Sequence, residues 1–514
     1  MQPIATKGLA TAPSQFNLVG SSTTQDAQCC QALSQSCLAS QTYFPDTISY
    51  NDRIESYWSV SASLSPTCMV LPTSPEDVTS IIQTITANEC SFGIRGGGHG
   101  SFAFSNSVDA GITIDFGFMN STTYNSDMKI ASIQPGSNWQ AVYETLAPYG
   151  VTVAGGRAGT VGVGGFITGG GNSFHSASHG FACDTVQNFE VVLANGSIVN
   201  ANADDNADLW QALKGGSGNF GLITRFDLYA IEFPSPNATD IWGGILVFDL
   251  NATNALIDNY VKFAENVESD QNSSSIIYWA YIPAAGGMVL NAALENTVNA
   301  VRPPAFDRYM STPGIIATSL RSAPMHEITA ELGSGQPASL RNIWFTGAYK
   351  NDARVLKYAV QKHEEIVALI EAEMSEDSGF NTLCMFQPIT QTLVQHSAEK
   401  GGNMLGLEDR VKDGNGVMFL ATLAVDGADN EAKALPHIRE WFDAVDGYAA
   451  SLDANWNWRY LNYAYKDQDP MKSYGDKSVE ELRRVAAKYD PSQVFQSLRK
   501  SGFKIPRARF MDSV

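Results

Sequence analysis

The sequence is short of charged residues, of basic residues and of long apolar runs, and each shortage excludes a class of protein. Charged residues make up 17% of the 514 residues, below the roughly 25% of an average domain. The 33 basic residues are outnumbered by 53 acidic ones, for a formal net charge of -20. Nucleic acid and anionic membranes repel such a chain. No run of 18 apolar residues offers a membrane span, so we expect neither as a partner.

The N-terminal stretch MQPIATKGLATAPSQFNL also lacks the apolar centre of a signal peptide. Either the protein is cytoplasmic, or it is exported and its signal has been removed. Glycosylation sequons favour export. They begin at Asn120, Asn195, Asn237, Asn251 and Asn272. We therefore expect a secreted glycoprotein, with a cytoplasmic location as the alternative.

Cysteine is scarce, but five of the seven cysteines lie within the first ninety residues. The positions are Cys29, Cys30, Cys37, Cys68 and Cys90, followed by Cys183 and Cys384. Early clustering of this kind predicts a disulfide staple and fits export. Because seven is odd, at least one thiol is free or pairs with another chain. Seven buried thiols in a cytoplasmic protein remain the alternative.

The length predicts more than one domain, and the residue pattern suggests where they divide. After a polar segment with a helix near Ala27–Leu38, strands and helices alternate from Thr67 to Glu232. Beyond Pro234, strands such as Ser275–Pro283 alternate with long helices such as Ala353–Glu373. The pattern predicts an α+β protein divided into residues 1–63, 64–235, 236–455 and 456–514.

Three glycine-rich loops, each beside a predicted strand, occupy residues 95–100, 155–171 and 215–221. Glycine lets backbone amides approach a ligand closely, and such loops form nests that bind anions. A pyrophosphate between two ring systems would suit them. No Gly-Lys-Ser/Thr motif is present, so this is no P-loop, and Gly162–Gly165 does not open the short βαβ unit of a dinucleotide fingerprint.

Histidines are few, and His99 stands in the first of these loops, after Arg95 and three glycines. That context favours a ligand-binding role for His99. His175 and His179 have a spacing that occurs in zinc sites, but no carboxylate or thiolate pair accompanies them. We therefore expect no metal site.

These motifs make the chain recognisable. The segments SFGIRGGGH (91–99), GGRAGTVGVGG (155–165), GFACD (180–184), GGSGNFG (215–221), YLNY (460–463) and KYDP with VFQ (488–496) stand in the order of one family. Together they resemble the fungal berberine-bridge-enzyme-like FAD-linked oxidases, which carry a vanillyl-alcohol-oxidase or PCMH-type FAD domain. The resemblance implies a PCMH-type FAD-binding domain of two α/β subdomains over 64–235. It also implies a substrate domain with an antiparallel sheet covered by helices, and a C-terminal segment that completes the FAD site.

The same resemblance implies how FAD is held. His99 corresponds to the histidine that bonds to the 8α carbon of the flavin, and the cysteine of a second link is replaced by Ala158. We therefore expect a single covalent link, a weaker oxidant and a more specific pocket. The pyrophosphate is expected at residues 95–101. The expected cofactor contacts are Arg95, Gly96, Gly97, Gly98, His99, Gly100, Ser101, Thr160, Val161, Gly164, Gly165, Thr168, Gly169, Gly170, Asp184, Asn219, Gly221, Ile223, Tyr460 and Asn462.

The expected reaction is oxidation of a small organic substrate, a secondary metabolite, with O2 restoring the flavin and giving H2O2. Tyr460 is the expected base, with Tyr463 as the second candidate. Val161 occupies the position at which the family admits oxygen. The protein is expected to be a monomer.

Three alternatives stay open. An oligosaccharide oxidase could stack sugars on Trp456 and Trp458. An isomerase or cyclase could use the same scaffold without net redox chemistry. A non-catalytic binding protein is the least favoured. Gln387 and Asn403 resemble a recurring fungal stretch and either face the pocket or pack beside it.

Overall fold

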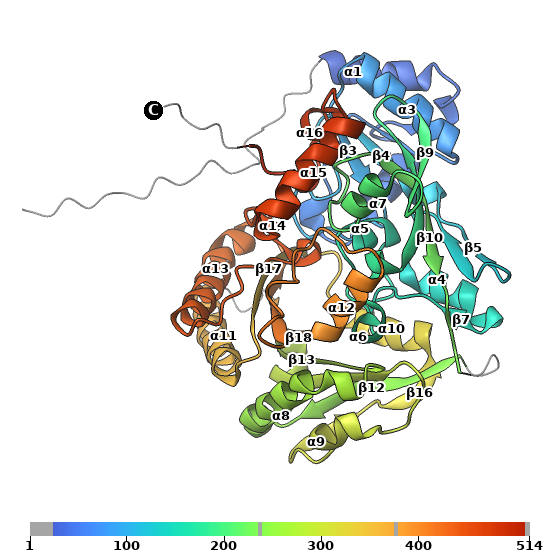
Figure 1. Cartoon of the computed structure of the whole chain (residues 1–514). Helices are drawn as coiled ribbons and strands as arrows, with labels where there is room; N and C mark the ends of the chain where they lie inside the picture. The colour runs from blue at the N-terminus through green and yellow to red at the C-terminus, as the bar shows by residue number, and fades with distance from the viewer. Residues whose placement is uncertain (1–23, 235–238, 375–378, 509–514) are drawn as a thin grey trace, which may run out of the picture.

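Early and late strands build separate sheets in the computed structural model, which describes residues 24–234, 239–374 and 379–508. Strands up to Glu232 form a first lobe, and strands from Asp240 onward form a second lobe (Figure 1). The C-terminal helices return to the first lobe. The α+β class expected from the sequence is confirmed.

The first sheet of the first lobe is small and mostly parallel. Its order is β1-β2-β4-β3, with β2 and β3 parallel to β4. Helix α3 (Pro75–Ala87) precedes β3 and buries an isoleucine-rich stripe. Its N-terminus is capped by Ser74, whose side chain accepts the N–H of Asp77. The strands are β1 (Thr42–Tyr43), β2 (Cys68–Val70), β3 (Phe92–Arg95) and β4 (Ile112–Asp115).

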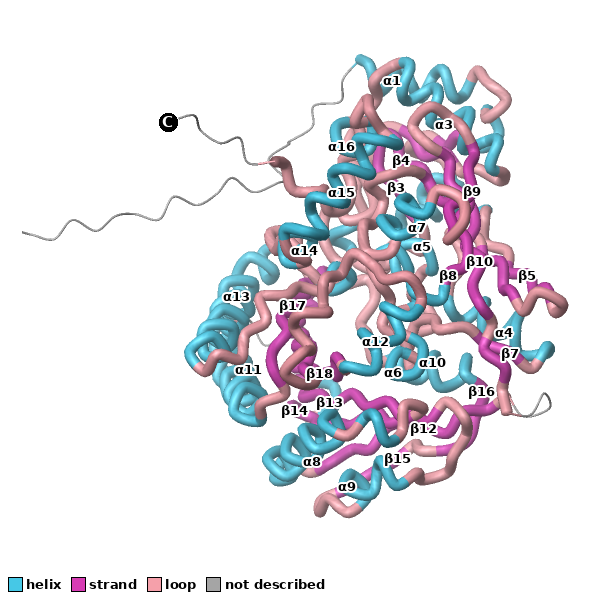
Figure 2. Tube along the Cα trace, viewed as in Figure 1, coloured by secondary structure: helices cyan, strands magenta, loops and turns pink. Residues whose placement is uncertain are grey.

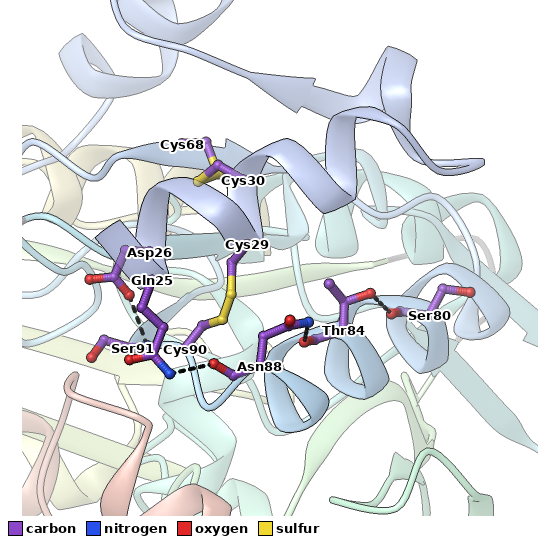
Figure 3. The surroundings of a disulfide bond; sticks show 10 residues. All are labelled: Gln25, Asp26, Cys29, Cys30, Cys68, Ser80, Thr84, Asn88, Cys90 and Ser91. Atoms are coloured by element: carbon purple, nitrogen blue, oxygen red, sulfur yellow. Dashed lines mark hydrogen bonds between the residues drawn. A yellow bond between two sulfur atoms is a disulfide. The ribbon is translucent and has the colours of Figure 1, made fainter. Parts of the chain in front are cut away.

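A disulfide staple ties helix α1 (Thr24–Ser34) to this sheet (Figure 3). Cys29 pairs with Cys90, just before β3, and Cys30 pairs with Cys68 at the start of β2. The Gln25 side chain also donates to Asn88 O (2.6 Å), and Asp26 Oδ1 accepts the N–H of Ser91 (3.1 Å). The predicted staple is confirmed, and Cys37, Cys183 and Cys384 carry free thiols.

The second sheet of the first lobe is antiparallel, in the order β5-β6-β10-β8-β9. A hairpin around Asn195-Gly196 joins β8 to β9, with Val192 opposite Ile198. Strand β10 ends at Tyr229, because the residues that follow Ala230 pair with β7 instead. The strands of this sheet are β5 (Thr122–Asn125), β6 (Ile130–Ile133), β8 (Val186–Val192), β9 (Ile198–Asn202) and β10 (Leu222–Tyr229). A separate two-stranded sheet consists of β7 (Val151–Thr152) and β11 (Ile231–Glu232).

Short helices lie within the connections between the strands of this lobe. The glycine-rich stretch that reads as a loop contains helix α5 (Val163–Thr168). The remaining helices of the lobe are α2 (Ile48–Glu55), α4 (Trp139–Leu146), α6 (Ser176–His179) and α7 (Ala207–Leu213).

The second lobe is built on one large antiparallel sheet, in the order β15-β12-β14-β13-β18-β19-β17, with β16 also paired to β12. Long helices pack against it, as Figures 1 and 2 show. The expectation of an antiparallel sheet covered by helices is confirmed. The strands are β12 (Asp240–Phe248), β13 (Ser273–Ile282), β14 (Gly287–Asn296), β15 (Ile315–Thr318), β16 (Arg321–Pro324), β17 (Arg341–Lys350), β18 (Phe380–Ile389) and β19 (Gly416–Val425).

Helices α11 and α13 contact each other as well as the sheet. No described helix is long and apolar enough to cross a membrane. The helices of the second lobe are α8 (Thr253–Glu265), α9 (Asp307–Met310), α10 (Met325–Ser334), α11 (Ala353–Glu373), α12 (Gln391–Glu399) and α13 (Ala428–Ser451).

The C-terminal segment closes the first lobe. Helices α14 (Pro470–Ser473), α15 (Asp476–Tyr489) and α16 (Val494–Ser497) follow the last strand of the second lobe. Beyond α16, the chain runs along the edge strand β3. The Phe92 N–H donates to Leu498 O (3.0 Å), and the Lys500 N–H donates to Phe92 O (2.7 Å). The Phe495 ring packs edge-on against the Phe92 ring. Residues some 400 positions apart therefore share one core.

Candidate active site: a glycine-lined cavity between the lobes

A cavity of about 670 Å³ lies between the glycine loops and the large sheet. Alternate residues of each strand point into it, as expected for one face of a pleated sheet. The sheet face is mainly apolar, with a few amides and aromatic rings. It contributes Ile276, Tyr278, Ala280, Asn291, Ala293, Leu383, Met385, Gln387, Leu420, Thr422 and Trp344.

Two of the glycine loops touch backbone to backbone beside this cavity. A Cβ atom on Gly97 would lie 2.5 Å from the Cα of Gly162, and the reverse distance is the same. No real Cβ tolerates that approach, so glycine is needed at both positions. The contact fixes the loop that carries His99 against the loop that carries Ala158.

The cavity is electropositive although the chain is strongly acidic. Among the described residues, no Asp, Glu or Lys lines it, but Arg157 and Arg499 do. The Arg499 guanidinium is 2% exposed and donates to Asn219 Oδ1 (2.7 Å) and to the Phe503 carbonyl (2.8 Å). Burial lowers the pKa of Arg499 to about 9, which still leaves it protonated at neutral pH. A buried cation of this kind suits a diphosphate.

His99 lies at the cavity wall, partly buried. Its imidazole stacks on the indole of Trp58, with ring centroids 4.3 Å apart and planes at 8°. Its Nε2 lies 3.4 Å from Thr160 Oγ1. Burial lowers the pKa of His99 to about 4, so the ring is neutral at physiological pH. A neutral imidazole offers a lone pair for bonding to carbon.

Arg95 was expected to contact the cofactor, but its side chain does not line the cavity. Its guanidinium lies over the Tyr57 ring, donates to Ser56 Oγ (2.7 Å) and is 3.3 Å from the Asp115 carboxylate. Asp115 also pairs with Arg53 at 2.7 Å. Arg95 therefore supports the glycine loop from behind, because its charge is already matched inside the lobe.

Asp184 and Asn219 also lie outside the cavity lining. The buried Asp184 carboxylate accepts hydrogen bonds from Phe181 N, Ser397 Oγ and Asn403 Nδ2, which join the two lobes. Burial raises the pKa of Asp184 despite these bonds. Asn403 thus packs beside the pocket, whereas Gln387 faces it.

Tyr460 lines the cavity, but the residue is only 1% exposed and its hydroxyl is already engaged. Its Oη accepts the N–H groups of Gly171 (2.9 Å) and Asn172 (2.8 Å), and the Asn462 amide donates to it at 3.0 Å. Burial raises the pKa of Tyr460 above its usual range. Asn462 also donates to the Phe166 carbonyl, so this segment is fastened to α5.

Tyr463 is more exposed than Tyr460, and its hydroxyl faces polar groups of the cavity. Arg157 Nη2 donates to Tyr463 Oη at 3.2 Å and also donates to Gln387 Oε1. Gln387 Nε2 lies 3.4 Å from the same Tyr463 oxygen. Because an arginine only donates, the Tyr463 oxygen acts as the acceptor toward both neighbours.

Aromatic rings connect this cluster to His99. Trp344 packs edge-on against Trp58, at 5.4 Å between ring centroids, and against Tyr463 at 5.3 Å. Trp58 lies in the N-terminal segment, for which the sequence suggested no role at the site. No sequence signal identified it, because its position depends on how that segment folds over the loop.

The structure brings most of the expected contact residues together and leaves some behind the wall. Those that line the cavity are Gly96, Gly97, Gly98, His99, Gly100, Ser101, Val161, Gly164, Gly165, Thr168, Gly221, Ile223, Tyr460, Asn462 and Tyr463. Thr160, Gly169 and Gly170 do not line the cavity but follow or precede lining residues in the sequence. Trp456 and Trp458 are buried elsewhere, and the Trp458 indole donates to the Leu405 carbonyl (2.8 Å). Their expected role in stacking sugars is not supported.

His175 and His179 lie near each other, with ring centroids 5.7 Å apart. Burial lowers their pKa values to about 3 and about 4. Within the described ranges, no group of three potential metal ligands gathers around them or anywhere else.

The glycine-lined cavity, its buried Arg499 and its lack of acidic walls fit a dinucleotide with a diphosphate, and they define a flavin-binding oxidoreductase. A family model described as an FAD binding domain matches residues 66–202. The FAD-dependent monooxygenase sdcF of Emericella nidulans is 37% identical over 483 residues, covering 93% of this chain and 98% of that protein. The monooxygenase drtC of Aspergillus calidoustus is 36% identical, covering 94% and 91%.

Solved structures share the fold. A berberine bridge enzyme variant in complex with (S)-reticuline matches with a TM-score of 0.73 and 16% identity, covering 95% of this chain and all of that one. A glucooligosaccharide oxidase of Acremonium strictum matches with a TM-score of 0.73 and 18% identity, covering 96% and 100%. The chain belongs to the berberine-bridge-enzyme-like family of FAD-linked oxidoreductases. It is an enzyme with FAD as its cofactor.

Proposed function

We propose that this enzyme is an oxidase that removes two electrons from a small organic substrate, a secondary metabolite, with Tyr463 as the base. One observation carries the proposal. The Tyr463 hydroxyl lies in the cavity as the acceptor of N–H groups from Arg157 and Gln387. An oxygen held in this way would accept a proton from the substrate.

The residues of the chain orient the substrate and move its proton. When bound, FAD supplies the two-electron acceptor for a substrate hydride, and O2 receives those electrons as H2O2. The large sheet provides a mainly apolar floor, with Tyr278 and Trp344 available to hold a ring. Burial between the lobes excludes water from the reacting carbon.

Tyr460, the first candidate from the sequence, fits a positioning role better than that of the base. Its oxygen already accepts three N–H groups, and it is nearly inaccessible. These bonds join residues 460–463 to the loop that follows α5. Tyr460 would therefore hold Tyr463 and Asn462 in place.

We further propose a covalent link between His99 and the 8α carbon of FAD. The neutral, stacked imidazole supports this link. Overall, one imidazole N–H and one 8α C–H are replaced by an N–C bond, and O2 takes up two electrons and two protons as H2O2. A second, cysteinyl link is not proposed, because Ala158 stands at that position.

The lining residues named above are the proposed FAD contacts, with Arg95, Asp184 and Asn219 supporting them from behind. Val161 also lines the cavity, and its small side chain leaves room for O2. The names of the relatives suggest a second candidate, a monooxygenase that transfers one oxygen atom to its substrate. The two reactions differ in whether oxygen from O2 enters the product.

An oligosaccharide oxidase is less well supported, because the sheet face is mainly apolar and Trp456 and Trp458 lie outside the cavity. An isomerase or cyclase without net redox chemistry would consume substrate and produce no peroxide. That outcome would contradict the oxidase proposal.

We also propose that the protein is an exported monomer. The N-terminal disulfides favour an oxidising compartment. Asn120, Asn195 and Asn251 are exposed, Asn272 is half-buried, and Asn237 lies outside the described residues. Glycosidase treatment of the secreted protein and light scattering would test these two points.

The deciding experiment starts from the purified yellow protein. Colour that stays with the acid-precipitated pellet is expected for the His99 link, and His99→Ala should release it. A substrate screen under ¹⁸O2 should then give H2O2 in a 1:1 ratio to product, with no ¹⁸O in the product. Labelled product would instead establish the monooxygenase.

A further inference from the structure

On the side of the large sheet, the cavity contains one cation, Arg157, that has no carboxylate partner among the described residues. Arg157 is half-buried in the loop after β7. Within the described residues, no carboxylate lies within ion-pair distance of it. Its only hydrogen bonds there run from Nη2 to Gln387 and Tyr463, which leaves Nε and Nη1 as unused donors. Burial of a charge without an anionic partner is unfavourable, so a partner is to be expected from outside the chain.

A buried acid that Arg157 influences, Glu295, does not supply that partner. Glu295 on β14 is fully buried, and both of its carboxylate oxygens lack a hydrogen-bond partner. Burial raises the pKa of Glu295 well above its usual range, and the charge of Arg157 opposes this shift. Because neither Glu295 oxygen has a hydrogen-bond partner, Glu295 leaves the free donors of Arg157 unengaged.

The two cations of the cavity serve different regions. Arg499 lies beside Gly218 and the end of β3, on the side of the glycine loops, where the diphosphate fits. Arg157 lies beside Gln387 and Tyr463, on the side of the large sheet. FAD can thus neutralise the first region and leave the second to the substrate.

The surroundings of Arg157 limit the rest of the ligand. The adjacent sheet face carries Ile276, Ala280, Ala293, Leu383 and Leu420, with Tyr278 and Trp344 among them. Such a face favours an apolar or aromatic body over a sugar. Further polar groups of the sheet side of the cavity are Asn291, Asn342, Asn381, Thr382 and Thr422.

We propose that Arg157 binds an anionic oxygen of the substrate, and that the substrate is an aromatic or otherwise apolar molecule with a carboxylate, an acidic phenol or an enol. This inference rests on the proposed function, since it uses the same cavity. The Arg157 guanidinium keeps Nε and Nη1 free to donate a charge-assisted hydrogen bond to such an oxygen. The contact would place the oxidisable carbon of the substrate near Tyr463.

Binding to the FAD-loaded protein tests this inference independently of turnover. Perturbation of the flavin spectrum would be titrated with 1-naphthoate, 1-naphthol and benzoate as acidic probes, and with 1-naphthamide as the neutral match. We expect naphthoate or naphthol to bind about tenfold more tightly than the amide, as one charge-assisted contact implies. Naphthoate against naphthol distinguishes a carboxylate from a phenolic oxygen.

Arg157→Gln keeps the length and a donor but removes the charge, and it should abolish the preference while leaving FAD content unchanged. Arg157→Lys should keep part of it. Arg308→Gln, an exposed change far from the cavity, is the matched control and should bind like the wild type. Equal binding of acid and amide, an unchanged preference in Arg157→Gln, or no binding by any acidic probe would each overturn the inference. If the preference is found but no substrate is oxidised, the proposed function fails and the anion site stands.

Discussion

The indole of Trp58 lies flat on the imidazole of His99, with 4.3 Å between ring centroids. Trp58 lies between β1 and β2, and its backbone N–H donates to Gly98 O at 3.1 Å. Two contacts from one residue therefore hold the loop that is proposed to bond the cofactor.

Replacement of Trp58 should loosen that loop. We expect Trp58→Ala to lower the fraction of covalently bound flavin and to cost about 3 kcal/mol of stability, through the cavity that it leaves. Trp58→Phe should retain most of both, because a ring remains to stack on His99. Flavin retained after acid precipitation and thermal unfolding would measure the two effects. An unchanged covalent fraction in Trp58→Ala would show that the stacking does not orient His99.

The contact between Gly97 and Gly162 predicts a steric effect. Gly97→Ala would place its Cβ 2.5 Å from Gly162 Cα. The loops would have to separate, at about 1–3 kcal/mol, so FAD content and melting temperature should both fall. Gly447→Ala is the control: nothing lies within 4 Å of its Cβ position in helix α13. It should stabilise the protein by about 0.5–1 kcal/mol. Full FAD content in Gly97→Ala would contradict the prediction.

The two tyrosines should respond differently to loss of the hydroxyl. Tyr463→Phe removes the proposed base, and we expect kcat to fall by about 10²–10⁴-fold with an unchanged flavin spectrum and stability. Tyr460→Phe leaves the buried N–H groups of Gly171 and Asn172 without their acceptor, and we expect a loss of about 1–3 kcal/mol of stability.

Steady-state kinetics and the pH–rate profile separate the two roles. Tyr460→Phe should raise KM more than it lowers kcat and should keep the wild-type profile, because the base remains. If Tyr460→Phe instead abolishes turnover and Tyr463→Phe does not, Tyr460 is the base.

The disulfides should contribute strongly to stability. The Cys29–Cys90 bond closes a loop with a sequence separation of 61 and ties α1 to the chain just before β3 (Figure 3). We expect the Cys29→Ser, Cys90→Ser double variant to lose about 2–5 kcal/mol. Cys37→Ser, at an exposed free thiol, should change stability by less than about 0.5 kcal/mol. Urea unfolding with and without reductant would measure both effects. Equal stability of the two variants would contradict the prediction.

A buried histidine predicts how stability depends on pH. His363 on α11 is fully buried, stacked on Trp441 and within 2.7 Å of Thr382 Oγ1. Burial lowers its pKa to about 3, against about 6.5 in an unfolded chain. Unfolding therefore takes up a proton between these values. The stabilising contribution is fully present above pH 6.5 and is lost as the pH falls, on the order of 3 kcal/mol by pH 4.

His363→Phe keeps a ring beside Trp441 and cannot be protonated. We expect its melting temperature to fall less than that of the wild type between pH 7 and pH 4. Parallel pH curves for the two proteins would show that His363 does not contribute. His99, His175 and His179 act in the same direction, so the variant should reduce the slope without removing it.

The sequence alone determines the elements whose signal is local. The cap at Ser74, the hairpin at Asn195-Gly196 and the glycine loops follow from backbone preferences that a few neighbouring residues determine. The clustered cysteines predicted the staple, although their pairing required the fold. The helix inside the glycine-rich stretch was missed, because α5 is stabilised by packing against its surroundings and its glycines disfavour a helix.

The order of the motifs along the chain determined the family, the cofactor and the two-lobed plan of this protein. Only the tertiary structure decided that Arg95, Asp184 and Asn219 lie behind the cavity wall, and that Tyr463 faces the cavity more openly than Tyr460. Only the tertiary structure brings Arg157, Gln387 and Tyr463 together, although Arg157 and Gln387 are 230 positions apart in the sequence. Backbone conformation is encoded locally, whereas the direction of a side chain and the groups it meets depend on how distant elements pack.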